Sequence, residues 1–168
     1  GGPLLAGRDF VSCDDGADFC TDPANALIAN DGNGWDDDAS DPGDWVSAGD
    51  LAHPIFQDCG DAVGDSSWHG TRVAALIAAR TNNAAGMAGI APGVLILPLR
   101  VLGKCTGYTS DVVAAMRWAA RLTVTGVADN AYPAAVINLS LGAKQPCSTT
   151  EQDAVNAIRQ RGVVIVAS

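Results

Sequence analysis

From residue 69 onward the chain alternates between helical and strand-like hydrophobic patterns, and this alternation restricts the possible folds more than any other feature. Residues 69–81 carry Val73, Leu76 and Ile77 at helical spacing, and residues 94–102 form a nearly continuous apolar run of strand length. Such runs are typical of parallel strands that are covered on both faces. The order helix, strand, helix, strand, helix, strand therefore predicts an α/β fold in which helices flank a parallel β-sheet.

The later elements carry their own start signals. Thr109 or Ser110 can cap the second helix, and Ser148 followed three residues later by Glu151 has the pattern of a capping box at the third. Residues 134–141 and 163–168 are the apolar runs beside these helices. We therefore expect two more strands there.

The first 65 residues differ from the rest in pattern and in charge. They are rich in Asp and Gly without sustained periodicity, so we expect an irregular region with only short strands. Fifteen aspartates and a single basic residue, Arg8, give this region a net charge of −14, whereas residues 66–168 carry +5. Such a region repels nucleic acid and attracts cations.

The length and hydropathy of the chain limit the number of domains and the kinds of partner that we expect. With 168 residues, of which 48% are apolar, the chain predicts one domain or most of one. Its longest apolar runs are far shorter than the roughly 20 residues that a membrane-spanning helix needs. We therefore expect neither a nucleic acid nor a membrane as a partner.

Three blocks, taken in order, resemble one protein family. A helix opens with His69-Gly70-Thr71, an apolar strand run ends near residue 103, and a second strand contains the residues from Val136 to Gly142. From about Asp65 to Ser168 this arrangement resembles the subtilisin-like serine proteases, or subtilases. The resemblance implies a subtilisin-like fold and a secreted serine endopeptidase that cleaves peptide bonds through an acyl-enzyme, with His69 as the general base.

Other catalytic motifs of that family do not occur in residues 1–168. The family's aspartate lies in Asp-Thr-Gly or Asp-Ser-Gly and its serine in Gly-Thr-Ser, and neither pattern is found here. We therefore expect the aspartate, the oxyanion asparagine and the serine to lie outside this chain, in the rest of the protease domain beyond both termini. On this interpretation residues 1–168 are an internal part of a single catalytic domain, with a loop-rich calcium-binding region at 1–65 and an alternating core at 66–168, and are inactive alone.

The resemblance also implies positions that contact a peptide or protein substrate. The backbone of the strand end pairs with the extended substrate chain, and a second segment forms the opposite wall of the cleft. Ser168 is expected at the floor of the primary pocket. The predicted substrate-binding residues are Leu102, Gly103, Gly107, Tyr108, Ser140, Leu141, Gly142 and Ser168.

An acidic segment at residues 31–44 is the candidate metal site. Calcium prefers six to eight oxygen ligands, and a loop rich in Asp and Gly can supply them, although the spacing is not that of an EF-hand. Many subtilases bind calcium in surface loops, so the resemblance supports calcium here; a solvated acidic turn is the alternative. The predicted ligands are Asp31, Asp36, Asp38, Asp41 and Asp44.

Five cysteines without zinc or redox spacing indicate an oxidising compartment, and we expect the protein to be secreted and extracellular. We favour a disulfide between Cys59 and Cys105, joining the loop before His69 to the loop after Leu102. A local pair of Cys13 with Cys20 leaves Cys147 for a partner outside the chain.

Two other functions remain open from the sequence. One is a catalytically inactive subtilase-like module that binds peptides or proteins. The other is a calcium-binding extracellular domain in which the helix after His69 is purely structural. A protease must have the missing aspartate, asparagine and serine motifs beyond the two termini, whereas neither of these alternatives needs them.

Overall fold

The computed structural model describes residues 4–20, 22–57, 59–60, 63–144, 146 and 148–168. It contains two compact units, Gly1–Tyr108 and Thr109–Ser168. None of the helices in this described part combines the length and the apolarity that crossing a membrane requires.

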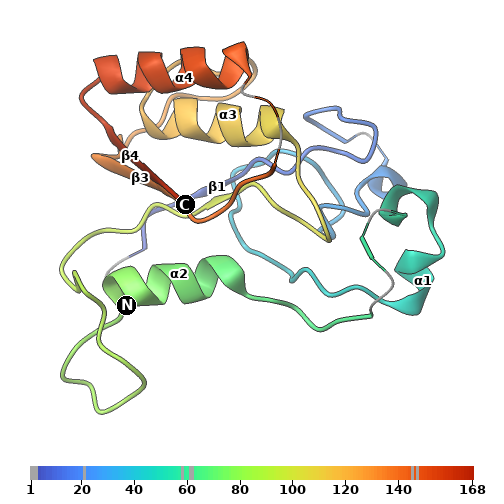
Figure 1. Cartoon of the computed structure of the whole chain (residues 1–168), viewed down its shortest axis with the longest axis horizontal. Coiled ribbons are helices and arrows are strands. Elements are labelled where there is room, and N and C mark those ends of the chain that lie inside the picture. The colour runs from blue at the N-terminus through green and yellow to red at the C-terminus, as the bar shows by residue number, and fades with distance from the viewer. Residues whose placement is uncertain (1–3, 21, 58, 61–62, 145, 147) are drawn as a thin grey trace. The chain divides into compact units, whose positions relative to one another are not determined.

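The first unit is rich in loops, as the sequence predicts for its N-terminal part. Its helices and strands, labelled in part in Figure 1, are β1 (Arg8–Asp9), the 3₁₀ turn η1 (Pro23–Asn25), α1 (Ala48–Leu51), the 3₁₀ turn η2 (Pro54–Phe56), α2 (His69–Ala78) and β2 (Leu99–Arg100). Strands β1 and β2 pair in parallel, with Asp9 opposite Arg100. The core beside them contains Val11, Ile28 and Phe56.

Strand β2 is much shorter than the predicted run 94–102. Pairing with the N-terminal segment begins at a bridge between Leu4 and Ile96. Single backbone hydrogen bonds continue from there to Phe10, whose N–H donates to the carbonyl oxygen of Arg100. Pro98 lies inside the run and has no N–H to donate, so a regular ladder forms only after it.

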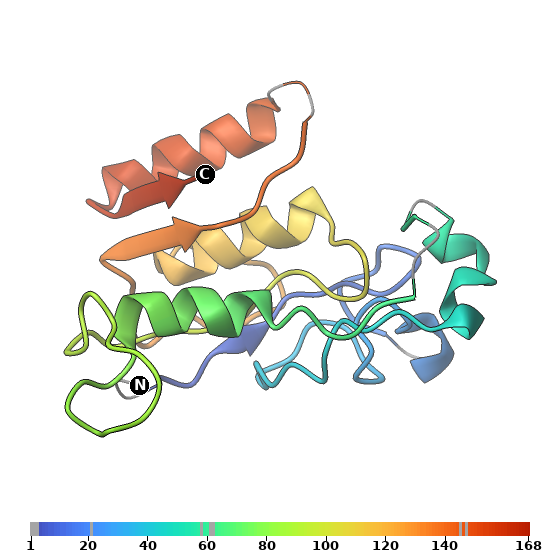
Figure 2. The same cartoon turned by 60° about the horizontal axis from the view of Figure 1, so that its bottom comes forward.

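Helix α2 ends three residues earlier than predicted. The backbone N–H groups of Ile90 and Ala91 donate to the carbonyls of Leu76 and Ile77, at 3.0 and 2.7 Å. These distant donors satisfy the carbonyls that a helix end leaves free. Residues 79–98, yellow-green in Figure 2, therefore leave the helix as a loop that returns to its end.

The second unit contains α3 (Thr109–Ala119), β3 (Val136–Leu139), α4 (Thr149–Gln160) and β4 (Val164–Ala167). Figure 2 shows β3 and β4 side by side and pointing the same way, and their parallel register runs from Val136 opposite Val164 to Leu139 opposite Ala167. Ser148 caps α4 by accepting the N–H of Glu151, which is the serine half of the predicted capping box. The order of elements from residue 69, and the parallel direction of both strand pairs, confirm the predicted α/β fold.

Both disulfides favoured by the sequence are present. Cys13 bonds to Cys20 and Cys59 bonds to Cys105, with Cα atoms 5.6 and 5.5 Å apart. Cys147 lies outside the described residues.

Candidate active site

His69 is the first residue of α2, and its side chain lies on an exposed part of the first unit. The residue before it, Trp68, has a left-handed backbone with φ 50° and supplies no side-chain cap. An aromatic residue adopts this conformation only when its surroundings hold it there. The histidine is thus presented at the beginning of a helix directly after a sharp change of chain direction.

The approach to His69 is fixed by a residue far away in the sequence. Asp44 accepts the backbone N–H and the hydroxyl of Ser67, each at 2.6 Å, and the Ser67 hydroxyl accepts the N–H of His69 at 3.3 Å. Burial alone raises the pKa of Asp44, but the hydrogen bonds from Ser67 outweigh it and hold that pKa below its usual value. Asp44 is therefore a carboxylate at neutral pH.

The segment at residues 102–108, predicted as one wall of the cleft, is held in place by contacts of Lys104 and Cys105. Lys104 is buried, its ammonium lies 3.1 Å from Oδ1 of Asp50, and it lies 4.7 Å from the centre of the Trp45 ring. The Cys59–Cys105 disulfide adds a covalent link at the next residue. Lys104 thus attaches this segment to residues 45–50, and the disulfide attaches it to the loop at Cys59.

The residues of this wall also have structural reasons for their identity. A Cβ on Gly103 would lie 2.0 Å from the carbonyl oxygen of Ile28, and one on Gly107 would lie 2.4 Å from that of Val101. The Tyr108 hydroxyl donates to the carbonyl of Asp14, and its ring packs against the core. Leu102, in contrast, is 42% exposed. Their predicted contact with substrate stays a prediction.

In the second unit, the predicted substrate strand lies at the carboxyl ends of β3 and β4. The N–H of Ser168 donates to the carbonyl of Leu139, and the carbonyl oxygen of Ser168 lies 3.8 Å from where a Cβ on Gly142 would be. Asn138 donates to the Ser140 hydroxyl at 3.0 Å. Leu141 is half-buried. The structure thus brings Gly142 and Ser168 close together.

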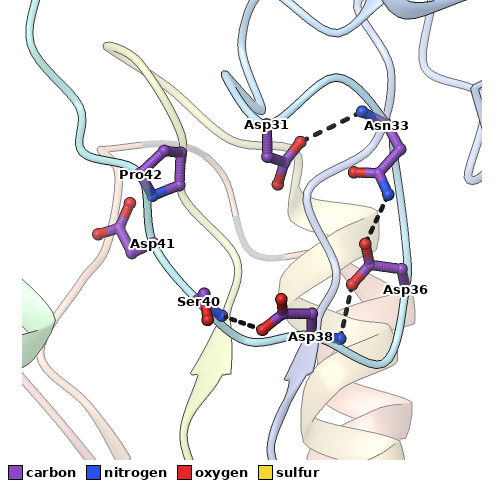
Figure 3. Close-up of a pocket in the computed structure, with 7 residues that line it drawn as sticks. All are labelled: Asp31, Asn33, Asp36, Asp38, Ser40, Asp41 and Pro42. Carbon is purple, nitrogen blue, oxygen red and sulfur yellow. Dashed lines mark hydrogen bonds between the residues drawn. The ribbon is translucent and has the colours of Figure 1, made fainter.

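The acidic segment forms a pocket of about 400 Å³ in the first unit. Figure 3 shows hydrogen bonds that run round this loop, from Asn33 to Asp31 and to Asp36, from Asp38 to Asp36, and from Ser40 to Asp38. Hydrogen bonds from the Ser40 side chain and backbone also lower the pKa of Asp38. The carboxylates stabilise the loop's own turns.

Arg100 neutralises the two ends of the same pocket. Its guanidinium pairs with Asp31 at 2.8 Å and with Asp41 at 3.4 Å, and it also binds Asp9 and the carbonyl of Ala29. The five predicted calcium ligands are therefore divided between Arg100, Ser67 and the loop backbone. Among the residues that the structure describes, no group of three metal-binding side chains converges on one point.

Several of the contacts described above cannot be predicted from the sequence. Asp9, Arg100, Lys104 and Asp50 form ion pairs between positions 54 to 91 apart, and Ser67 is bound by a carboxylate 23 positions away. The one available signal is a charged Arg100 inside an apolar strand run, because a buried charge needs a partner.

Comparisons with known proteins find matches over most of the chain. A family model described as the subtilase family matches residues 35–168. The chain is 45% identical over 165 residues to an extracellular protease of Xanthomonas campestris pv. campestris, and 39% identical over 165 residues to an extracellular basic protease of Dichelobacter nodosus. Each alignment covers 98% of this chain and 25% of the relative.

A solved structure described as proteases from Pseudoalteromonas arctica superimposes with a TM-score of 0.81 at 44% identity. It covers 98% of this chain and 43% of its own. The chain therefore spans about a quarter of the two curated relatives and less than half of the solved protease.

Proposed function

Because this chain belongs to the subtilase family, we propose that it is part of a secreted serine endopeptidase in which His69 is the general base. The observation that carries this proposal is the position of His69, the first residue of an exposed helix inside the region matched by the family. Two extracellular proteases that align over nearly the whole chain support secretion and an action on peptide bonds.

In this reaction the imidazole of His69 takes the proton of a serine hydroxyl as the oxygen attacks the scissile carbonyl. It then gives that proton to the departing amine, which leaves an acyl-enzyme. Water hydrolyses this ester by the same proton transfers. We infer that the catalytic serine, the aspartate that orients His69 and the oxyanion asparagine lie in segments outside residues 1–168, and we expect residues 1–168 alone to be inactive.

Substrate binding is assigned to both predicted segments. Leu102, Gly103, Gly107 and Tyr108 form one wall, which the Lys104 contacts hold rigid. Ser140, Leu141 and Gly142 offer a strand end to the substrate backbone, beside Ser168. A rigid wall suits a protease because an extended peptide must be held in one register for attack.

Calcium binding at the acidic loop is the finer part of the proposal. Carboxylate oxygens are the ligands that calcium prefers, but the observed arrangement does not fit all five predicted ligands. Binding by Asp31 and Asp41 requires them to leave Arg100, whereas Asp36 and Asp38 have no ion pair with an arginine or lysine among the described residues. We therefore place calcium at the Asp36–Asp38 end of the pocket.

Labelling with a fluorophosphonate tests the protease function. The complete protein that contains this chain should be labelled at one serine, and labelling should depend on His69. A complete protein that is folded but unlabelled would instead indicate a binding module.

A further inference from the structure

The helix that presents His69 begins without the usual means of stabilising its first turn. Trp68 occupies the cap position with no side-chain hydrogen bond, and the first turn of α2 contains no acidic residue. The first backbone N–H groups of a helix need acceptors, and negative charge near them is favourable. Side chains from outside the helix, or water, can meet these two requirements.

Ser67 and Asp44 meet both of them. A hydroxyl has one proton, and Ser67 gives it to Oδ2 of Asp44 at 2.6 Å. Its oxygen can then only accept, and it accepts the N–H of His69 at 3.3 Å. Asp44 thus fixes the direction in which the Ser67 hydroxyl faces, and it brings a negative charge close to the start of α2.

Asp44 is itself held firmly on both sides. The next residues form a bridge in which Val46 and Gly64 exchange hydrogen bonds of 2.9 and 3.0 Å. On the other side, a Cβ on Gly43 would lie 2.4 Å from the Ser66 hydroxyl oxygen, so the two segments are closely packed. Asp44 is half-buried between them. Its carboxylate has little freedom to move away from Ser67.

We propose that Asp44 is a positioning residue for His69, acting through Ser67. The proposal rests on the proposed function of His69 as general base. A general base must lie within hydrogen-bond reach of the proton that it takes, so a shift of the helix start displaces the imidazole from the serine. Asp44 itself contacts neither the substrate nor the catalytic serine.

A matched pair of variants at residue 67 tests the proposal in the complete protease at saturating calcium. Ser67→Thr keeps the hydroxyl. Ser67→Val introduces a side chain with the shape of threonine but without the hydroxyl. We expect Ser67→Val and Asp44→Ala to lower kcat by about 10- to 100-fold with KM nearly unchanged, as displacement of a catalytic group does. Ser67→Thr should retain most of the wild-type kcat.

Asp37→Asn is the control for removing a charge from the same acidic region, because Asp37 is exposed and outside the predicted ligand set. It should leave kcat unchanged. Melting temperatures show that each variant is folded in the assay.

The proposal is overturned if Ser67→Val retains the wild-type kcat, if the loss falls on KM instead, or if Asp37→Asn loses as much as Asp44→Ala. A loss of kcat in Asp44→Ala that is seen at low calcium but not at saturating calcium also overturns the proposal, because that result assigns Asp44 to metal binding. His69→Ala separates the two hypotheses. Full activity in that variant contradicts the role of His69 as general base, whereas its inactivity beside an active Ser67→Val contradicts only the positioning role.

Discussion

Asp9 and Arg100 lie opposite each other in the parallel pair β1–β2 and form a buried ion pair, with Oδ2 and Nη1 2.5 Å apart. Asp9 is fully buried and Arg100 is 7% exposed. The same guanidinium also pairs with Asp31 and Asp41. One buried cation therefore joins the strand pair to both ends of the acidic pocket.

Removing Arg100 should be strongly destabilising. Arg100→Met leaves the Asp9 carboxylate buried without a counter-ion, which costs about 3–5 kcal/mol in comparable ion pairs. Urea unfolding of the complete protein at pH 8 measures this loss. A double variant, Asp9→Leu with Arg100→Met, should recover part of the lost stability. A single variant as stable as wild type would contradict the role given to the pair.

Stability should also depend on pH through Asp9. Burial raises the pKa of Asp9 to about 7, although Arg100 acts to lower it. The native state then binds a proton more tightly than the unfolded chain, whose carboxyl has a pKa of about 3.9. Asp9 thus contributes stability at low pH that is lost as the pH rises through 7. Asp9→Asn should flatten the fall in unfolding free energy between pH 5 and 8; an unchanged slope would contradict this.

The two disulfides should differ in their contribution to stability. Cys59–Cys105 closes a segment with a sequence separation of 46 residues, and Cys13–Cys20 one of 7. Chain entropy predicts a loss of about 4 kcal/mol for the Cys59→Ala, Cys105→Ala variant and about 2–3 kcal/mol for Cys13→Ala, Cys20→Ala. Denaturant unfolding compares them. Equal losses would show that loop length does not decide the effect.

Calcium should stabilise the protein through Asp36 and Asp38. A ligand that binds only the folded state raises the melting temperature as its concentration increases. We expect this rise in calcium chloride, its reversal by a chelator, and its reduction in Asp36→Asn with Asp38→Asn. Asp37→Asn should respond as wild type does. A melting temperature independent of calcium in the complete protein would argue against the site.

The sequence predicts the order of helices and strands well because local periodicity determines it. Their ends are less predictable, since Pro98 shortens β2 and the N–H groups of Ile90 and Ala91 end helix α2. His69 is found from its motif. The contact between Asp44 and Ser67 is not found, because a pairing across 23 residues of irregular chain leaves no periodic signal.

The most direct test of the proposed function is the rate at which the complete protein cleaves a small peptide substrate with His69 intact and with His69→Ala. His53→Ala is the matched control, since His53 is exposed and its imidazole Nδ1 accepts the N–H of the nearby Ile55 at 3.3 Å. We predict that kcat falls by about 10⁴- to 10⁶-fold in His69→Ala, the range for loss of a triad member, and stays near wild type in His53→Ala. A folded His69→Ala protein that retains its peptidase activity would contradict the assignment of His69 as the general base.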